Sequence, residues 1–193
     1  MTVSRLCASF QPPIQRSYKF EQGDWLAKKK KTFGKRGCCY AFCAIWLRMR
    51  RAAQPGEDTF ARYVETPDGD EAVMDIFLRQ KRNDEKAVEN YMTMYGYRQS
   101  QEIKNPPGAS GLDRTLRAAS QPGFFIIGLS SIGVEDEYTG HALAVDSFVP
   151  AVFDPNIGQF SMQRGQIVEF LNGLFVFGYR DLSGESMYQK FMK

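Results

Sequence analysis

Histidine is scarce in this sequence, since His141 is the one histidine among 193 residues. Structural zinc sites in proteins usually take four ligands from regularly spaced cysteine and histidine residues. One histidine and no second, spaced pair of cysteines do not support such a site, so we expect neither a metal nor another cofactor. A reaction that needs an imidazole must use His141.

Long apolar runs are also missing. No stretch approaches the roughly 20 apolar residues that span a bilayer, so we expect a soluble protein. Pro12, Pro13 and Gln15 interrupt the N-terminal region, which therefore lacks the apolar segment of a cleavable signal peptide. Met1 is followed by threonine and not by the glycine that myristoylation requires.

The chain has little excess of charge of either sign. Its 25 basic and 22 acidic side chains leave a formal net charge of +3, which does not indicate a nucleic-acid-binding protein. The basic residues are nevertheless concentrated before the cysteine-rich segment, at Lys28, Lys29, Lys30, Lys31, Lys35 and Arg36. Such a run is typical of a solvated surface, and contact with an anionic membrane or an acidic partner is the alternative. Few aromatic residues accompany it, so we expect no nucleic acid as a partner.

Cysteine is sparse as well, and three of the four cysteines lie close together at Cys38, Cys39 and Cys43. Near neighbours in one helix close no useful loop, so these residues are not a disulfide framework and should act as thiols. From residue 37 to about 51, apolar side chains recur at intervals of three and four. This spacing predicts a helix that is buried on one face.

The remaining pattern predicts helices first and a sheet second. A helix or helix pair is expected over residues 71–95, after a turn at 66–70, and a short helix should follow the loop at 105–111. Compact or alternating apolar runs predict strands at 124–129, 141–146, 152–153, 158–160 and 174–177, with a helix over 162–171. The fold class is therefore α+β, with an N-terminal helical part packed on a C-terminal antiparallel sheet. We expect residues 1–23 to be an extended arm, disordered in part, and residues 24–193 to be one domain.

The order of the reactive residues indicates a thiol hydrolase. A free thiol of pKa about 8.5 is mostly protonated at neutral pH, so a nucleophilic cysteine needs a helix N-terminus or an imidazolium nearby. Here cysteines open an apolar helix, His141 lies in a later strand, and Asp154 follows thirteen residues further on. These are the parts of a papain-like site, in papain-like order.

Periodicity alone does not choose the nucleophile, because Cys38 and Cys39 are both three or four residues from Phe42. Purely structural roles for these residues are also compatible with the pattern. Buried cysteines often behave as small apolar residues, which is our interpretation of Cys7 and Cys43. His141 could be a core histidine, and Asp154 before a proline could be only a turn former.

Three segments resemble one family of enzymes. Residues 37–46, Gly-Cys-Cys-Tyr-Ala-Phe-Cys-Ala-Ile-Trp, are similar to the pattern Gly-x-Cys-x-x-Leu-Ser-x-x-Trp of the YopT and AvrPphB cysteine proteases. His-Ala-Leu-Ala at 141–144 and Phe-Asp-Pro-Asn-Ile-Gly-Gln-Phe at 153–160 resemble that family's later motifs, in the same order. The resemblance implies a papain-like fold in which Cys39 attacks, His141 transfers protons and Asp154 orients the imidazole.

The resemblance also implies a biological setting and exposes one departure. Family members are bacterial effectors, so the protein is expected to be secreted without a cleavable signal peptide and to cut host proteins. The basic run would then favour acidic or membrane-surface substrates. Papain-like enzymes usually carry Gln or Asn five or six residues before the nucleophile as an oxyanion donor, whereas Phe33 and Gly34 stand here. The Cys39 backbone amide remains, and Gln22 or Lys35 could supply the side-chain donor.

Two other functions fit the same residues. The triad could serve deamidation, acyl transfer or hydrolysis of cell-wall peptides, because all of these proceed through the same acyl-enzyme. Without the usual oxyanion residue, the chain could also be an inactive papain-like scaffold that binds a partner.

Overall fold

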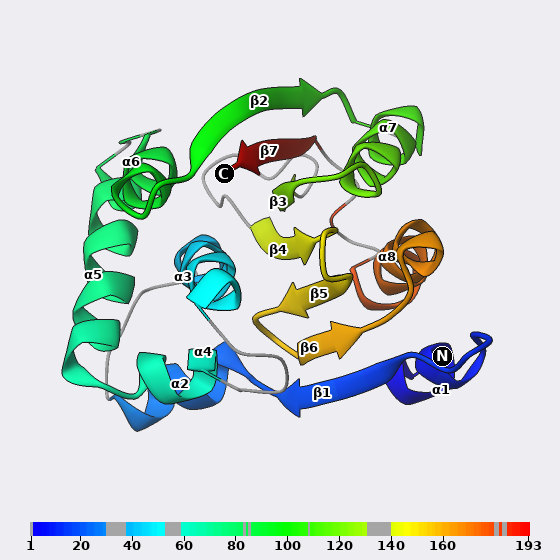
Figure 1. Ribbon diagram of the computed structural model, residues 1–193, viewed down its shortest axis with the longest axis horizontal. Coiled ribbons are helices and arrows are strands. Elements are labelled where there is room, and N and C mark those ends of the chain that lie inside the picture. Colours follow the sequence, from blue (N-terminus) through cyan, green and yellow to red (C-terminus); the bar gives the residue numbers. More distant parts are fainter. Residues whose placement is uncertain are drawn as a thin grey trace.

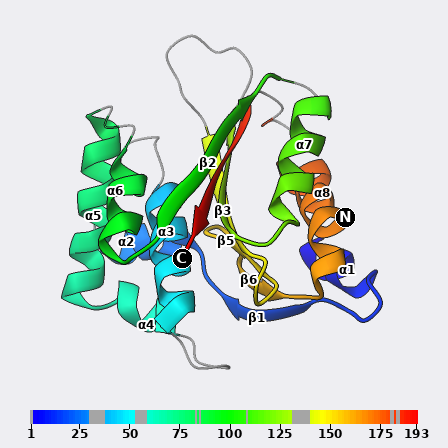
Figure 2. The same cartoon turned by 45° about the horizontal axis from the view of Figure 1, so that its top comes forward.

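The computed structural model describes residues 2–29, 38–52, 59–82, 84, 86–107, 109–130, 140–179, 182 and 185–193. A sheet forms the middle layer, and helices cover both of its faces (Figures 1 and 2). This is an α+β architecture, as the sequence predicts.

The sheet of the described part has seven strands, and every pair of neighbours is antiparallel. The strand order is β1-β6-β5-β4-β3-β7-β2. The bounds are β1 Gln15–Lys19, β2 Arg98–Asn105, β3 Phe124–Ser130, β4 Gly140–Asp146, β5 Ala151–Asp154, β6 Gly158–Ser161 and β7 Ser186–Met192. The central strands β3, β4 and β5 are almost wholly buried, which explains their apolar sequences.

Alternate residues of the central strands enter two separate cores. In β3, Ile126 packs into the core with α3, whereas Phe125 and Ile127 pack into the core with α7 and α8. In β4, the side facing α3 carries alanines, at Ala142 and Ala144. Small side chains let the α3 helix approach the sheet closely, and this places the N-terminus of α3 beside the start of β4.

One face of the sheet is covered by the helices from α2 to α6, on the left in Figure 2. Their bounds are α2 Gln22–Lys28, α3 Cys39–Ala52, α4 Thr59–Val64, α5 Pro67–Lys81 and α6 Ala87–Met94. The predicted turn at 66–70 is the start of α5, because Thr66 Oγ1 accepts the Gly69 N–H at 3.1 Å and Pro67 occupies the first turn. The predicted helix at 71–95 is the pair α5 and α6.

The opposite face is covered by α1 Val3–Ala8, α7 Ala109–Ala119, a short 3₁₀ turn Arg164–Gln166, and α8 Ile167–Gly178. The prediction of a strand at 174–177 is wrong, because these residues continue α8. Apolar residues occupy so much of this helix that the local run looks like a strand. The helical period shows in burial, since Leu171, Leu174 and Phe175 are buried while Val176 and Phe177 are about half exposed.

The N-terminal segment also differs from the expected extended arm. It forms α1, then β1, which pairs with β6 at the edge of the sheet. Phe10 is buried and its ring meets that of Phe170 at 6.2 Å in an edge-on arrangement. Gly173 of α8 leaves room for Leu6, whose Cδ1 would lie 2.6 Å from an added Cβ. Residues before 24 are therefore part of the same sheet and core.

Candidate functional site

Three segments that are distant in sequence meet at one end of the sheet. Cys39 opens α3, His141 is the second residue of β4, and Asp154 ends β5. All three side chains are nearly or fully buried, with exposures of 5%, 4% and 0%. The three residues that the sequence singles out are thus brought to one place.

The imidazole of His141 lies between the carboxylate and the thiol. His141 Nε2 is 3.0 Å from Asp154 Oδ1, and the imidazole also has a hydrogen bond with the Cys39 side chain. A carboxylate accepts, so Nε2 carries a proton and Nδ1 remains for the thiol. The contact with Cys39 agrees with the register that the family resemblance implies for the nucleophile.

The electrostatic surroundings favour a charged imidazole. Burial lowers the pKa of His141, but the charge and hydrogen bond of Asp154, together with Cys39, outweigh it and raise the pKa to about 10. A buried carboxylate beside an imidazole is the arrangement that fixes the tautomer and stabilises the imidazolium. The group is therefore protonated at neutral pH.

Asp154 acts as a turn former as well as a partner of His141. Its backbone oxygen accepts the Ile157 N–H at 3.0 Å, and its Oδ1 accepts the Asn156 N–H at 2.8 Å. The turn ends at Gly158, whose φ of +126° and contact with the Tyr18 carbonyl admit no side chain. Asp154 therefore forms the turn and also contacts His141, so the two interpretations from the sequence are compatible.

Tyr179 is a member of the site that sequence reasoning missed. Its hydroxyl donates to Asp154 Oδ2 at 2.5 Å, and its ring stacks on His141 with centroids 4.5 Å apart and planes at 24°. Burial raises the pKa of Tyr179, and the Asp154 charge raises it further, so the hydroxyl stays protonated and can donate. No local motif marks this residue, which follows α8 directly.

Gln22, one of the two oxyanion candidates, has a different set of contacts. Its Oε1 accepts the backbone N–H of Cys38 at 3.1 Å, and its Nε2 donates to Asn156 Oδ1 at 2.6 Å. The side chain therefore connects the residue before α3 to the turn that follows Asp154. The other candidate, Lys35, and the positions of Phe33 and Gly34 lie outside the described residues.

Further contacts lock the cysteine helix to the aspartate strand. Trp46 of α3 is fully buried, as expected for a core residue, and stacks on Phe153 at 5.4 Å with planes at 11°. Its indole N–H donates to Gln159 Oε1 at 2.8 Å. These contacts hold α3 against β5 and β6.

The other thiols and the described part of the basic run have contacts of their own. All four cysteines are buried thiols outside any disulfide, and burial raises the pKa of Cys7 and, more strongly, of Cys43. Of the basic run, Lys28 pairs with Glu65 at 2.9 Å, while Lys30 and Lys31 lie outside the described residues. Within the described part, no cluster of three or more metal-ligating side chains occurs, and no helix has the length and apolar character to cross a membrane.

Comparison with known proteins yields one family and one structure to report. Residues 14–186 match the peptidase family described as Yersinia/Haemophilus virulence surface antigen. The fold resembles the crystal structure of the Pseudomonas avirulence protein AvrPphB, with a TM-score of 0.58 and 15% sequence identity. That similarity covers 81% of this chain and 92% of the other, and identifies the fold as papain-like. No curated protein sequence matches significantly.

Proposed function

Since the chain belongs to the Yersinia/Haemophilus virulence surface antigen family of cysteine peptidases, we propose that Cys39, His141 and Asp154 form its catalytic triad. The observation that carries this proposal is the position of the His141 ring, which contacts the carboxylate through Nε2 and also contacts the thiol. We further propose that the substrates are proteins of a host cell into which the enzyme is delivered.

The geometry supports a two-step acyl transfer. The Cys39 thiolate attacks the carbonyl carbon of the substrate amide, and the carbonyl electron pair moves to the oxygen. As the C–N bond breaks, the imidazolium of His141 gives its Nδ1 proton to the leaving amine. Neutral His141 then removes a proton from water, which attacks the thioester. Breaking the C–S bond releases the acid and restores the thiolate and imidazolium.

Asp154 and its neighbours keep the imidazole in place through these steps. The carboxylate accepts a hydrogen bond from Nε2–H at 3.0 Å, so the ring presents Nδ1 to the sulfur and the leaving group. Tyr179 lies against the ring and donates to the second carboxylate oxygen. The start of α3 adds the partial positive charge of a helix N-terminus near the sulfur.

The proposal is tested by cleavage of proteins in an extract of eukaryotic cells, read as new N-termini by mass spectrometry. We expect the wild-type protein to create new N-termini and Cys39→Ala to create none, while circular dichroism shows both to be folded. Cys38→Ala is the matched control, because it removes the adjacent thiol and should retain cleavage.

Cleavage by Cys39→Ala at the wild-type rate would refute the assignment, and loss of cleavage in Cys38→Ala alone would move the nucleophile by one residue. The same spectra separate other reactions of the triad. A gain of about one dalton on glutamine or asparagine would indicate deamidation, and an added group would indicate acyl transfer. A wild-type protein that changes no protein in the extract would support a binding scaffold.

A further inference from the structure

Gln22 contacts two segments of the proposed active site from a separate element. It is the first residue of α2, and its backbone N–H donates to the Pro155 carbonyl at 2.7 Å. Its side-chain oxygen accepts the Cys38 N–H at 3.1 Å, and its side-chain nitrogen donates to Asn156 Oδ1 at 2.6 Å. One glutamine is therefore bonded to the residue before the proposed nucleophile and to the turn after the proposed aspartate.

Asn156 continues these contacts toward the imidazole. Its side chain has a hydrogen bond with Tyr179, whose hydroxyl donates to Asp154 Oδ2 at 2.5 Å. Its backbone N–H donates to the other carboxylate oxygen, Asp154 Oδ1, at 2.8 Å. The side-chain hydrogen bonds thus form one series, which runs from Cys38 through Gln22, Asn156 and Tyr179 to Asp154.

The two ends of this series set the direction of the bonds within it. A backbone N–H can only donate and a carboxylate can only accept. Gln22 Oε1 therefore faces Cys38, and Gln22 Nε2 is left to donate to Asn156 Oδ1. The remaining Asn156 group, Nδ2, is a donor for the Tyr179 oxygen. Burial and the Asp154 charge raise the pKa of Tyr179, whereas the Asn156 bond lowers it, as a donor to a phenol oxygen does.

The bond to Cys38 lies at the start of the cysteine helix. The Cys38 carbonyl accepts the Phe42 N–H at 3.0 Å, which begins the helical pattern of α3. The N–H groups at the start of a helix have no partner within it. Gln22 supplies an acceptor from outside the helix, and so fixes the position from which Cys39 extends.

We propose that Gln22 and Asn156 are positioning residues, which hold the helix of the proposed nucleophile in place relative to the carboxylate that orients the imidazole. They act through Cys38 at one end of the series and through Tyr179 at the other. This inference rests on the proposed protease function. It gives Gln22 a role other than the oxyanion donor considered from the sequence, because its side-chain nitrogen is bonded to Asn156.

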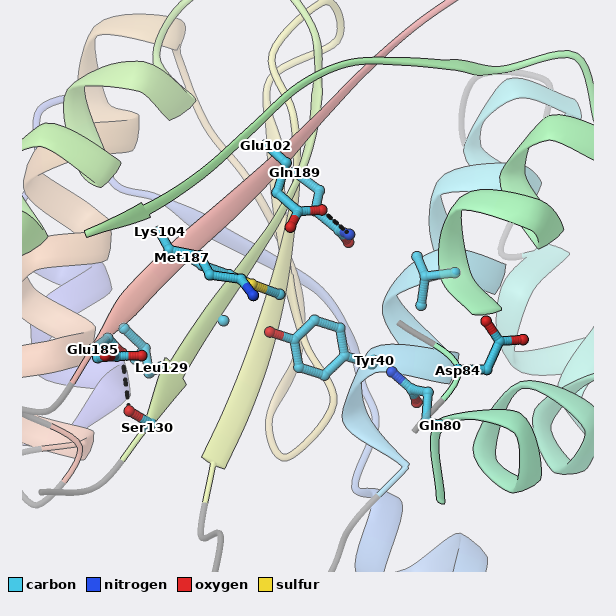
Figure 3. A pocket seen from close by; sticks show the side chains of 12 residues that line it. Tyr40, Gln80, Asp84, Glu102, Lys104, Leu129, Ser130, Glu185, Met187 and Gln189 are labelled. Carbon is cyan, nitrogen blue, oxygen red and sulfur yellow. Dashed lines mark hydrogen bonds between the residues drawn. The ribbon is translucent and has the colours of Figure 1, made fainter. Parts of the chain in front are cut away.

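A pocket of about 350 Å³ lies next to Tyr40, between the sheet and the helices α5 and α6 (Figure 3). Its walls come mainly from α3, α5, α6 and the strands β2, β3 and β7. Neither Gln22 nor Asn156 contributes to these walls. Their substitution should therefore leave this pocket intact, and should change the rate of the chemical steps more than the binding of a substrate.

A double-mutant cycle on the steady-state kinetics of a cleaved peptide tests the proposal. Gln22→Met keeps the length of the side chain and removes both of its hydrogen bonds, while Asn156→Ala keeps the backbone N–H that donates to Asp154. Each variant should lower kcat about fivefold and leave KM within about twofold, because each removes hydrogen bonds but no substrate contact. The double variant should be about as slow as the slower single variant, since both substitutions break the same series. Asn172→Ala, at an exposed position of α8, is the matched control and should keep kcat.

Three results of this cycle would overturn the proposal. Wild-type kcat in both single variants would show that the series does not affect the reaction. A loss of about a hundredfold or more in Gln22→Met, with nearly wild-type kcat in Asn156→Ala, would instead make Gln22 an oxyanion donor. Losses that multiply in the double variant would show that the two residues act independently.

A second measurement needs no turnover. Hydrogen exchange of the Cys38 amide, followed by NMR in ¹⁵N-labelled protein, reports whether the bond to Gln22 is made. Asn156→Ala should speed this exchange, because the Gln22 side chain loses the partner that orients its amide, and Asn172→Ala should not. An unchanged Cys38 rate in Asn156→Ala would overturn the proposal whether or not the protein cleaves peptides. A faster rate in a protein that cleaves nothing would count against the protease function and not against the series of contacts.

Discussion

Among single residues, Asp154 shows best how one side chain serves both fold and chemistry. Its carboxylate is fully buried and is held by three donors, from His141, Asn156 and Tyr179. Such a group is costly to bury without partners, so each donor offsets part of the cost of burial and helps to orient the carboxylate. The sequence predicts the turn and the contact with His141, because both belong to recognisable motifs. It does not predict the contact with Tyr179, because a separation of 25 residues from Asp154 carries no periodic signal.

We predict that Tyr179→Phe lowers kcat about tenfold and leaves KM nearly unchanged, since the variant keeps the stacked ring but removes one hydrogen bond to a charged group. Steady-state kinetics on a peptide cleaved by the wild type measures this. Tyr188→Phe, which removes the hydroxyl of a tyrosine on β7, separated by β4 and β3 from the Asp154 strand β5, is the control and should retain kcat. Wild-type kcat in Tyr179→Phe would show that Tyr179 does not position Asp154.

At the scale of elements, sequence periodicity identifies the helices and strands that are buried on one face or completely. The α3 helix and the strands β3 to β6 follow the predicted ranges closely, because their apolar residues repeat with a clear period or form compact runs. The edge strands β1 and β2 have mostly exposed, polar residues and give no such signal. Pairing with a neighbouring strand creates them, and pairing across more than 80 residues is not visible in local sequence.

The packing of the N-terminal segment, α1 and β1, can be tested by one substitution. Phe10→Ala should lower the free energy of unfolding by about 3 to 5 kcal/mol, because it removes a buried ring that packs on α8 and leaves a cavity. Denaturant unfolding followed by circular dichroism measures the change. An exposed arm would instead give a loss below about 0.5 kcal/mol, as for Gln11→Ala, the exposed neighbour that serves as the control.

At the scale of the whole molecule, the antiparallel sheet and its two cores bring three distant segments together. The Trp46 contacts with Phe153 and Gln159 hold α3 against β5 and β6. Gln22 of α2 bonds to Cys38, just before α3, and to Asn156, between β5 and β6. Cys39, His141 and Asp154 can be picked out in the sequence because each lies in a short motif. The place of Tyr179 beside His141 and Asp154 cannot, since it depends on the complete fold.

The central claim is that this fold holds Cys39 and His141 as a thiolate and imidazolium pair, and thiol alkylation as a function of pH tests it most directly. The pKa of His141 is raised to about 10, so the positive charge that stabilises the thiolate is present throughout the neutral range and is lost only as pH rises through that value. Iodoacetamide labelling should be followed for each cysteine by tandem mass spectrometry. Cys7 and Cys43 serve as internal controls, because burial raises the pKa of both thiols.

The account predicts that Cys39 is alkylated rapidly at pH 6, far ahead of the other three cysteines. In His141→Ala the reaction should become slow at this pH, because the imidazolium that stabilises the thiolate is gone. Four uniformly slow thiols in the wild-type protein at pH 6, or a Cys39 rate that His141→Ala leaves unchanged, would contradict it.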